Sequence, residues 1–264
     1  MSAKSSKTTV TEVRDLFKSA VSVGDLSGKS AEVLIENLDD TNIMGCLGAG
    51  VDDLSTDDVT LCGVVLDMSG SMTDVRKVVI EAFNSMMQSM KDSKQEESIL
   101  VSAWIFDDQP ELLFGYTPVA RVQELTEKEY FPRGSTALYD AQLNALTGLV
   151  AYGQQLRDRG IRTKSIVVVL SDGADNRSQT RDSKVKKVAD DLTARETYAL
   201  AFAGFITGEP VDFRLIAQNT GFPSIITVDS TPSEVRRIFG LVSKSVIKVS
   251  QTQVGKDKSS FFTP

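Results

Sequence analysis

The fold is decided by residues 59–71, whose sequence is Val-Thr-Leu-Cys-Gly-Val-Val-Leu-Asp-Met-Ser-Gly-Ser. Residues 59–66 are nearly all apolar, which is typical of a central strand that is covered on both faces. The apolar run ends at Asp67, and a short turn of serine and glycine follows it. A second apolar run, residues 165–170, is followed by another carboxylate, Asp172. Two such runs predict the parallel sheet of an α/β domain.

Helical patterns alternate with the apolar runs from residue 59 onward, as expected of βαβ units. Apolar residues recur at helical spacing in residues 72–90, 136–156, 185–192, 213–217 and 232–249. Further strands are expected at residues 99–106, 111–116, 198–205 and 224–228. The short polar turn between the first two predicts an antiparallel hairpin at one sheet edge. The sequence therefore predicts a three-layer αβα fold with a doubly wound, mostly parallel, Rossmann-like sheet and one antiparallel edge strand.

The pattern divides the chain into three parts. Residues 1–57 form a helical and acidic N-terminal segment, residues 58–249 the α/β domain, and residues 250–264 a polar C-terminal tail. There is no Lys or Arg from residue 31 to residue 58. The N-terminal segment is expected either to pack on the domain or to contact a partner, and the sequence does not choose between these two roles.

The composition excludes several classes of function. The chain of 264 residues contains no histidine, which excludes a Ser-His-Asp triad, a histidine general base and histidine-ligated zinc or haem. The formal net charge of -7 disfavours nucleic acid as a partner. The N-terminus is polar, and no apolar run approaches the roughly 20 residues of a membrane span. We therefore expect a cytoplasmic protein with no membrane partner.

Three polar clusters lie where a buried strand or its return loop reaches the start of a helix. The clusters are residues 67–71 (Asp-Met-Ser-Gly-Ser), residues 134–136 (Gly-Ser-Thr) and residues 171–173 (Ser-Asp-Gly). In open parallel sheets, ligands bind beyond the carboxyl ends of the strands, where the strand order reverses. Topology alone therefore predicts that the three clusters meet in one site.

The side chains of these clusters suit a hard divalent cation. The predicted metal ligands are Asp67, Ser69, Ser71, Thr136 and Asp172. Carboxylate and hydroxyl oxygens without nitrogen or sulfur favour Mg²⁺ most, with Mn²⁺ and Ca²⁺ as the other candidates. For each residue taken singly, the competing interpretation is ordinary capping of a helix N-terminus. Five further acids are candidates to ring the same crevice, and they are Asp74, Asp107, Asp108, Asp140 and Asp175.

The three clusters together resemble the von Willebrand factor A (VWA) domain family, over roughly residues 58–249. The resemblance rests on Asp-x-Ser-x-Ser after the first strand, Gly-Ser-Thr-Ala-Leu-Tyr-Asp-Ala opening a helix, and Ser-Asp-Gly after a later strand. All parts of the family's metal-ion-dependent adhesion site are present in order. The resemblance implies that Ser69, Ser71 and Thr136 contact the ion directly. It also implies that Asp67 and Asp172 act mostly through bound waters, which leaves one position for a partner's Asp or Glu.

These features predict a non-enzymatic, metal-dependent module for protein–protein interaction, acting as an adaptor or an assembly subunit. Similar stand-alone domains suggest an AAA-type ATPase as one partner, by analogy only. Two alternatives stay open. In the first, the cation only staples the strand ends of a structural subunit. In the second, Asp67 is the nucleophile of a metal-dependent phosphatase or hydrolase, although Ser69 stands where a haloacid-dehalogenase-type phosphatase has its second Asp.

Overall fold

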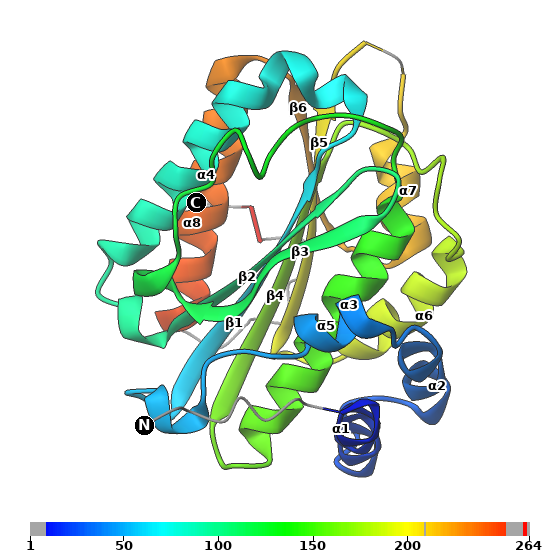
Figure 1. Cartoon of the computed structure of the whole chain (residues 1–264), viewed down its shortest axis with the longest axis vertical. Coiled ribbons are helices and arrows are strands. Elements are labelled where there is room, and N and C mark those ends of the chain that lie inside the picture. The colour runs from blue at the N-terminus through cyan, green and yellow to red at the C-terminus, as the bar shows by residue number, and fades with distance from the viewer. Residues whose placement is uncertain (1–8, 209, 252–260, 263–264) are drawn as a thin grey trace.

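The computed structural model describes residues 9–208, 210–251 and 261–262. Six strands form one sheet in the order β3-β2-β1-β4-β5-β6 (Figure 1). Their bounds are β1 Asp58–Asp67, β2 Ile99–Phe106, β3 Pro110–Pro118, β4 Arg162–Ser171, β5 Tyr198–Ile206 and β6 Ser224–Asp229. All neighbours pair in parallel except β2 and β3, which are antiparallel. The predicted doubly wound sheet with one antiparallel edge strand is confirmed.

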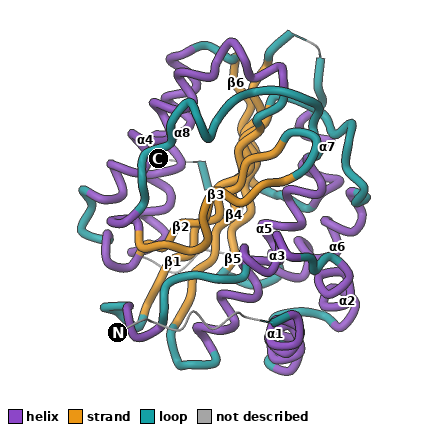
Figure 2. The backbone as a smooth tube through the Cα atoms, in the orientation of Figure 1, coloured by secondary structure: helices purple, strands orange, loops and turns teal. Residues whose placement is uncertain are grey.

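Helices cover both faces of the sheet, so the molecule has three layers (Figure 2). The helices are α1 Val10–Ser22, α2 Gly28–Glu36, α3 Asp40–Gly45, α4 Arg76–Lys91, α5 Leu138–Arg157, α6 Asp182–Thr193, α7 Phe213–Thr220 and α8 Pro232–Gln251. One core cluster joins α4 and α8 to the first face of the sheet, and a second joins α5, α6 and α7 to the other face. Among the described residues, no helix combines the length and the apolar character needed to cross a membrane.

The order in which strands are added to the sheet reverses at β1, which pairs in parallel with both β2 and β4. After β1 the chain builds the sheet on one side through β2 and β3, and then returns through α5 to build it on the other side. The carboxyl ends of β1 and β4 are therefore neighbours at the point where the strand order reverses, the place where open α/β sheets bind ligands.

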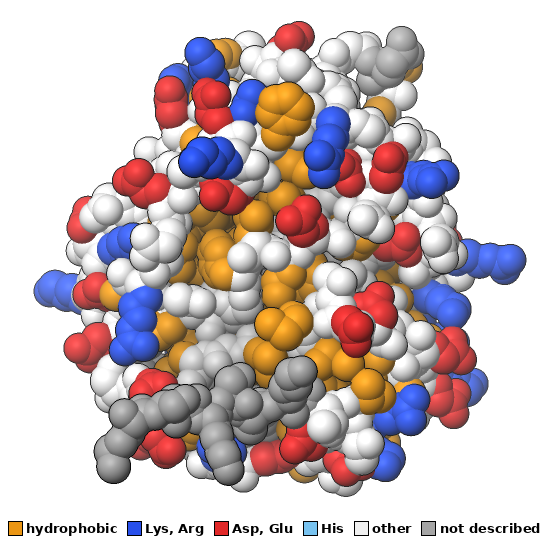
Figure 3. Space-filling view, in the orientation of Figure 1, with side chains coloured by type: hydrophobic (Ala, Val, Ile, Leu, Met, Phe, Trp, Pro, Cys, Tyr) orange, Lys and Arg blue, Asp and Glu red, His pale blue; other side chains and the backbone are white. Residues whose placement is uncertain are grey.

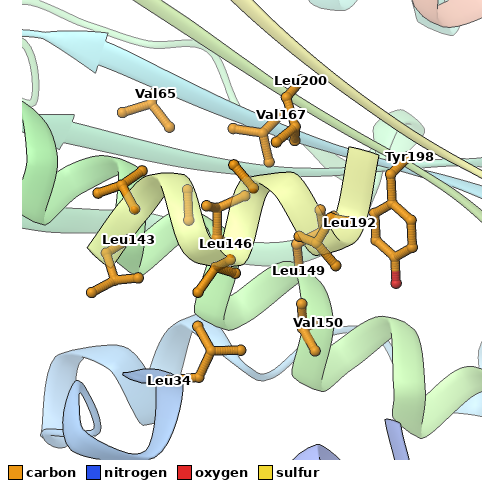
Figure 4. Close-up of a cluster of buried hydrophobic side chains, with 14 of the residues drawn as sticks. Leu34, Val65, Leu143, Leu146, Leu149, Val150, Val167, Leu192, Tyr198 and Leu200 are labelled. Atoms are coloured by element: carbon orange, nitrogen blue, oxygen red, sulfur yellow. The ribbon is translucent and has the colours of Figure 1, made fainter. Parts of the chain in front are cut away.

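Helix α5 is the centre of its layer. Most of its residues are buried, including polar ones, because β1 and β4 lie on one side and the N-terminal helices on the other. Figure 4 shows Leu143, Leu146 and Val150 of α5 between Val167 of β4 and Leu34 of α2. A helix enclosed in this way has a fixed position, so the loop that enters it is fixed as well.

The N-terminal segment packs on the domain. Val13 and Phe17 of α1 and Leu34 of α2 are fully buried in the core cluster that contains α5. The sequence predicts a helical and acidic N-terminal segment, which agrees with α1 and α2, but its pattern does not show the short helix α3. Packing, one of the two roles considered for this segment, is thus observed among its described residues.

The same segment covers the edge strand β3. The backbone N–H of Ala49 donates to the carbonyl of Tyr116 over 2.8 Å, and the N–H of Tyr116 donates to the carbonyl of Leu47 over 3.0 Å. The ring of Tyr116 stacks on the ring of Tyr152 from α5, with centroids 5.0 Å apart. The backbone N–H and carbonyl of Tyr116 therefore cannot pair with a strand of another chain.

The C-terminal residues differ from the polar tail that the sequence predicts. Ser250 and Gln251 continue α8, and the hydroxyl of Ser245 donates to the carbonyl of Phe261. Phe261 and Phe262 are buried in the core cluster of α4 and α8. The prediction fails at these two positions because an isolated apolar pair in a polar stretch carries no periodicity. Residues 252–260 and 263–264 lie outside the described residues.

Hydrophobic side chains gather on the face that β3 and α3 present to the viewer (Figure 3). A groove of about 790 Å³ lies there, lined among others by Met44 of α3 and Leu112 and Phe114 of β3. None of the five predicted site residues lines this groove. The predicted site lies instead at the carboxyl ends of β1 and β4.

We expect Gly48→Ala to destabilise the protein, because a Cβ atom at this position would lie 2.4 Å from the ring of Tyr152. Overpacking of this kind costs about 1–3 kcal/mol, which corresponds to a melting temperature lower by about 2–12 °C. Gly28→Ala is the control, since its Cβ would meet no atom within 4 Å. Thermal unfolding followed by circular dichroism measures both, and equal melting temperatures for the two variants would contradict the packing described here.

Candidate metal centre

Two of the three predicted clusters meet directly at the carboxyl ends of β1 and β4. The hydroxyl of Ser71 donates to Oδ1 of Asp172 over 2.9 Å. The hydroxyl oxygens of Ser69 and Ser71 are 3.1 Å apart. Asp67 is the last residue of β1, and its Oδ1 accepts the backbone N–H of Ser69 over 2.8 Å. Four of the predicted ligands thus form one connected group.

Thr136 reaches the same place from the loop that enters α5. Its backbone N–H donates to the side-chain oxygen of Asn176 over 2.8 Å, and the N–H of Asn176 donates to the Thr136 carbonyl over 3.1 Å. A Cβ at Gly173 would lie 3.5 Å from the Thr136 hydroxyl oxygen. The threonine hydroxyl is therefore beside the residue that follows Asp172.

Helix capping does not account for these hydroxyls. The cap residue of α5 is Ala137, one residue after Thr136, and no side chain caps that helix end. Ser69 does precede the 3₁₀ helix Gly70–Val75, but its side chain makes no capping hydrogen bond there. The competing interpretation of ordinary N-caps therefore fails for both residues. Their hydroxyl oxygens are available for another role.

The Asp67 carboxylate is fully buried, and its environment opposes ionisation. The pKa of Asp67 is raised to about 6, mainly by burial, and the charge of Asp172 acts in the same direction. Hydrogen bonds from Ser69 and from the hydroxyl of Ser171, 2.5 Å away, partly offset this increase. Two neighbouring buried carboxylates are costly to ionise unless a positive charge lies between or beside them.

Asp172 carries the clearest sign of a missing ligand. Its side chain is buried, and Oδ2 has no hydrogen-bond partner among the described residues. A buried carboxylate oxygen without a donor loses its hydration and gains nothing in exchange. A divalent cation would supply that compensation. The donor set, two carboxylates and three hydroxyls, fits a hard cation such as Mg²⁺, Mn²⁺ or Ca²⁺.

The group is not a cluster of acids. Within the described part of the chain, no three His, Cys, Asp or Glu side chains converge as a metal site. Ligation of a cation by these residues would therefore depend on Ser69, Ser71 and Thr136 as much as on Asp67 and Asp172. Such a site carries few protein charges, so part of the cation's charge would stay available for a further anionic ligand.

Loops 67–70 and 130–134 are hydrogen-bonded to each other. The hydroxyl of Tyr130 donates to the carbonyl of Asp67 over 2.6 Å, and the N–H of Arg133 donates to the carbonyl of Met68 over 2.8 Å. The N–H of Gly70 donates to the carbonyl of Gly134 over 3.3 Å. These bonds hold residues 67–71, which we call the serine loop, against the loop that carries Thr136.

Tyr130 and Ser171 are site residues that sequence reasoning did not assign. Ser171 lies in the quoted Ser-Asp-Gly cluster, so the adjacent carboxylate was a usable signal. Tyr130 gave no such signal, because its partner is a backbone carbonyl distant in sequence. Both act on Asp67, one through its carboxylate and the other through its backbone.

The acids expected to ring the crevice mostly hold loops in place. Asp107 forms an ion pair with Arg133, whose Nε lies 2.8 Å from Oδ2. Asp108 accepts the backbone N–H of Ser135 over 2.9 Å, and Asp140 accepts two backbone N–H groups of the loop after β4. These contacts tie the loops together, and Arg133 offsets the negative charge that Asp107 was expected to add.

Fold and site together define a doubly wound α/β domain with an oxygen-lined centre at its topological switch point. The von Willebrand factor type A domain model matches residues 63–240, and the chain belongs to this family. No curated protein matches the chain in sequence.

Solved structures share the fold at low sequence identity. A von Willebrand factor type A structure from Catenulispora acidiphila is 10% identical with a TM-score of 0.51, covering 72% of this chain and 43% of its own. The PilB minor pilin from Streptococcus sanguinis is 11% identical (TM-score 0.52; 75% and 63% covered). The pilus adhesin SpaC from Lactobacillus rhamnosus GG is 13% identical (TM-score 0.56; 74% and 31% covered). The chain therefore spans less than two thirds of each of these structures.

We expect Asp67→Asn to stabilise the cation-free protein at pH 7.5. The folded-state pKa of about 6 is above the ordinary value, so the stability that Asp67 contributes is present below about pH 4 and is lost as the pH rises through 6. Asn keeps the acceptor for Ser69 and can donate to Ser171, but it carries no charge. The melting temperature in EDTA should therefore rise by about 2–6 °C at pH 7.5 and by less at pH 5.

Asp58→Asn is the control for this prediction. Asp58 begins the same strand and pairs with Arg162 and Lys164, so its loss should not raise the melting temperature. A lower melting temperature for Asp67→Asn than for the wild type in EDTA at pH 7.5, or a difference that does not change with pH, would contradict the electrostatic account of the centre.

Proposed function

We propose that the protein is a metal-dependent module for protein–protein interaction. In this proposal Ser69, Ser71 and Thr136 ligate a divalent cation through their hydroxyls, while Asp67 and Asp172 act mostly through bound waters. The carboxylate of a partner's Asp or Glu completes the coordination, as in a metal-ion-dependent adhesion site. The observation that carries the proposal is the buried Oδ2 of Asp172, which has no donor among the described residues and lies beside hydroxyls that cap no helix.

When bound, the cation would supply a Lewis-acidic centre toward an incoming carboxylate, with Mg²⁺ as the first candidate and Mn²⁺ or Ca²⁺ as alternatives. The chain's own residues position and hold that centre. Tyr130 and Ser171 fix Asp67, while Asn176 fixes the backbone of Thr136. Family membership supports the proposal, because VWA domains commonly serve protein interaction or adhesion.

The enzymatic alternative is less favoured by the geometry. A phosphatase that uses Asp67 as nucleophile needs a carboxylate oxygen within reach of substrate. Asp67 is fully buried, and each of its oxygens already accepts a hydrogen bond. We propose a non-enzymatic role, and an assay with p-nitrophenyl phosphate in Mg²⁺ and in EDTA checks it.

The structural alternative uses the same ion without a partner. In that case the cation only relieves the repulsion between Asp67 and Asp172, and Mg²⁺ raises the melting temperature without creating any binding to a partner.

The cellular location and the identity of the partner belong to the proposal as well. An adaptor or assembly subunit in the cytoplasm, acting with an AAA-type ATPase or other complex subunits, rests on analogy with similar domains.

The proposal is tested first at the hydroxyl of Thr136. Thr136→Val removes the hydroxyl and keeps the shape of the side chain, so we expect Mg²⁺ affinity to fall by at least about tenfold. Ser135→Ala is the neighbouring control and should leave the affinity within about twofold, because no metal role is assigned to it. Isothermal titration calorimetry of the two variants and the wild type measures the difference, and equal affinities would remove Thr136 from the site.

Partner capture tests the role of the metal. Immobilised wild type, Thr136→Val and Asp67→Ala are exposed to native lysate in Mg²⁺ and in EDTA, and bound proteins are identified by mass spectrometry. We expect partners that appear only with the wild type in Mg²⁺. The same set of partners in every condition would place binding on another surface and leave the cation with a structural role.

A further inference from the structure

Phe131 is an exposed aromatic side chain in the loop that leads into α5. Its exposed fraction is 54%. The large hydrophobic side chains that are exposed among the described residues are Val10, Val23, Met44, Phe131, Ile206 and Leu215. Of these, Phe131 belongs to the loop that is hydrogen-bonded to the serine loop of the candidate metal centre. Its position in this loop makes Phe131 a candidate contact for a partner bound at that centre.

Residues on both sides of Phe131 contact the first two residues of the serine loop, Asp67 and Met68. The hydroxyl of Tyr130 bonds to Asp67, the N–H of Phe131 lies 3.2 Å from the sulfur of Met68, and the N–H of Arg133 donates to the carbonyl of Met68. Met68 stands between Asp67 and Ser69 in the chain. Phe131 and Arg133 are therefore anchored next to the residues proposed to hold the cation.

Arg76 holds the Phe131 ring in a fixed orientation. The guanidinium carbon lies 4.6 Å from the centroid of the ring, and the group donates to the carbonyls of Tyr130 over 3.0 Å and of Glu127 over 2.6 Å. One face of the ring is covered by a cation that is itself fixed, while the side chain as a whole stays more than half exposed. An immobilised aromatic group loses little conformational freedom when a partner covers it.

The charges on this side of the centre are positive as well as negative. Arg133 pairs with Asp107, and its side chain is 63% exposed. Hydrogen bonds from Ser135 hold the pKa of Asp108 below its usual value, and the nearby charges of Arg177 and Arg133 act in the same direction. Arg76 also lies beside an acid, with a nitrogen 3.6 Å from the carboxylate of Glu127. Both arginines are therefore paired within the protein, and the selectivity of this edge comes from the Phe131 ring rather than from net charge.

We propose that Phe131, Arg76 and Arg133 form a recognition rim, which selects partner segments that carry a large apolar side chain next to the metal-binding Asp or Glu. The inference rests on the proposed function, because the carboxylate is what brings the segment to the rim. The apolar neighbour covers the open part of the Phe131 ring, and such aromatic and arginine positions are the ones that dominate binding at interfaces. The occupant is a segment of another protein.

The test uses the full chain and a peptide array. Each peptide has one fixed Asp in a Gly-Ser background, and the residues on either side of it are Gly, Leu, Phe, Lys or Asp. The array is probed in Mg²⁺ and in EDTA. We expect Mg²⁺-dependent binding that is strongest when Leu or Phe flanks the Asp. Phe131→Ala should weaken binding of those peptides by about tenfold and leave the Gly-flanked peptides unchanged.

Two comparisons keep the test specific. Val23→Ala, at an exposed hydrophobic position after α1, should bind every peptide as the wild type does. Phe131→Ala should also keep the Mg²⁺ affinity of the wild type, because Arg76 still bonds to the carbonyls of Tyr130 and Glu127. A loss of Mg²⁺ affinity in Phe131→Ala would give the ring a structural role and overturn the inference.

The outcomes separate this inference from the function on which it rests. If no Asp peptide binds in an Mg²⁺-dependent way, the proposed function fails and the inference fails with it. If Asp peptides bind with Mg²⁺ but Phe131→Ala keeps the same flanking preference, only the inference fails. Self-association of the wild type in sedimentation analysis, lost in Phe131→Ala, would make a second copy of the chain the occupant and would also overturn it.

Discussion

The burial of two neighbouring carboxylates is the constraint on which the rest of the site depends. Asp67 and Asp172 lie at the ends of neighbouring strands, β1 and β4, and burial and the charge of Asp172 both disfavour ionisation of Asp67. One oxygen of Asp172 lacks a donor among the described residues. A fold places two such groups together only at a cost in stability, and a bound cation is the simplest way to offset that cost.

The surrounding structure keeps the two carboxylates from moving apart. β1 and β4 pair from Asp58 and Arg162 to Leu66 and Leu170, and apolar layers on both faces fix the sheet. Helix α5 is enclosed by the sheet and by α1 and α3, so the loop that carries Thr136 has little freedom. The N-terminal segment therefore contributes to the site indirectly, through the helix that it covers.

The sequence predicts the sheet and most of the helices because β1 and the second half of β4 are almost uniformly apolar and the helices have regular apolar stripes. Four predicted site residues, Asp67, Ser69, Ser71 and Asp172, follow from the same logic, since strand ends in a parallel sheet converge. The fifth, Thr136, lies in the loop that enters α5. Whether those residues ligate a cation stays a prediction. Contacts between distant segments could not be predicted in this way. Tyr130 reaches Asp67 across 63 residues, α3 is too short to show periodicity, and Phe261 and Phe262 interrupt a polar stretch.

The location of a bound ion tests the account most directly. A crystal grown in Mn²⁺ and measured at the manganese absorption edge would show the ion by its anomalous scattering. The account predicts one strong peak within about 2.5 Å of the hydroxyl oxygens of Ser69, Ser71 and Thr136. A well-ordered site with no anomalous peak, or a peak held by other residues, would contradict it.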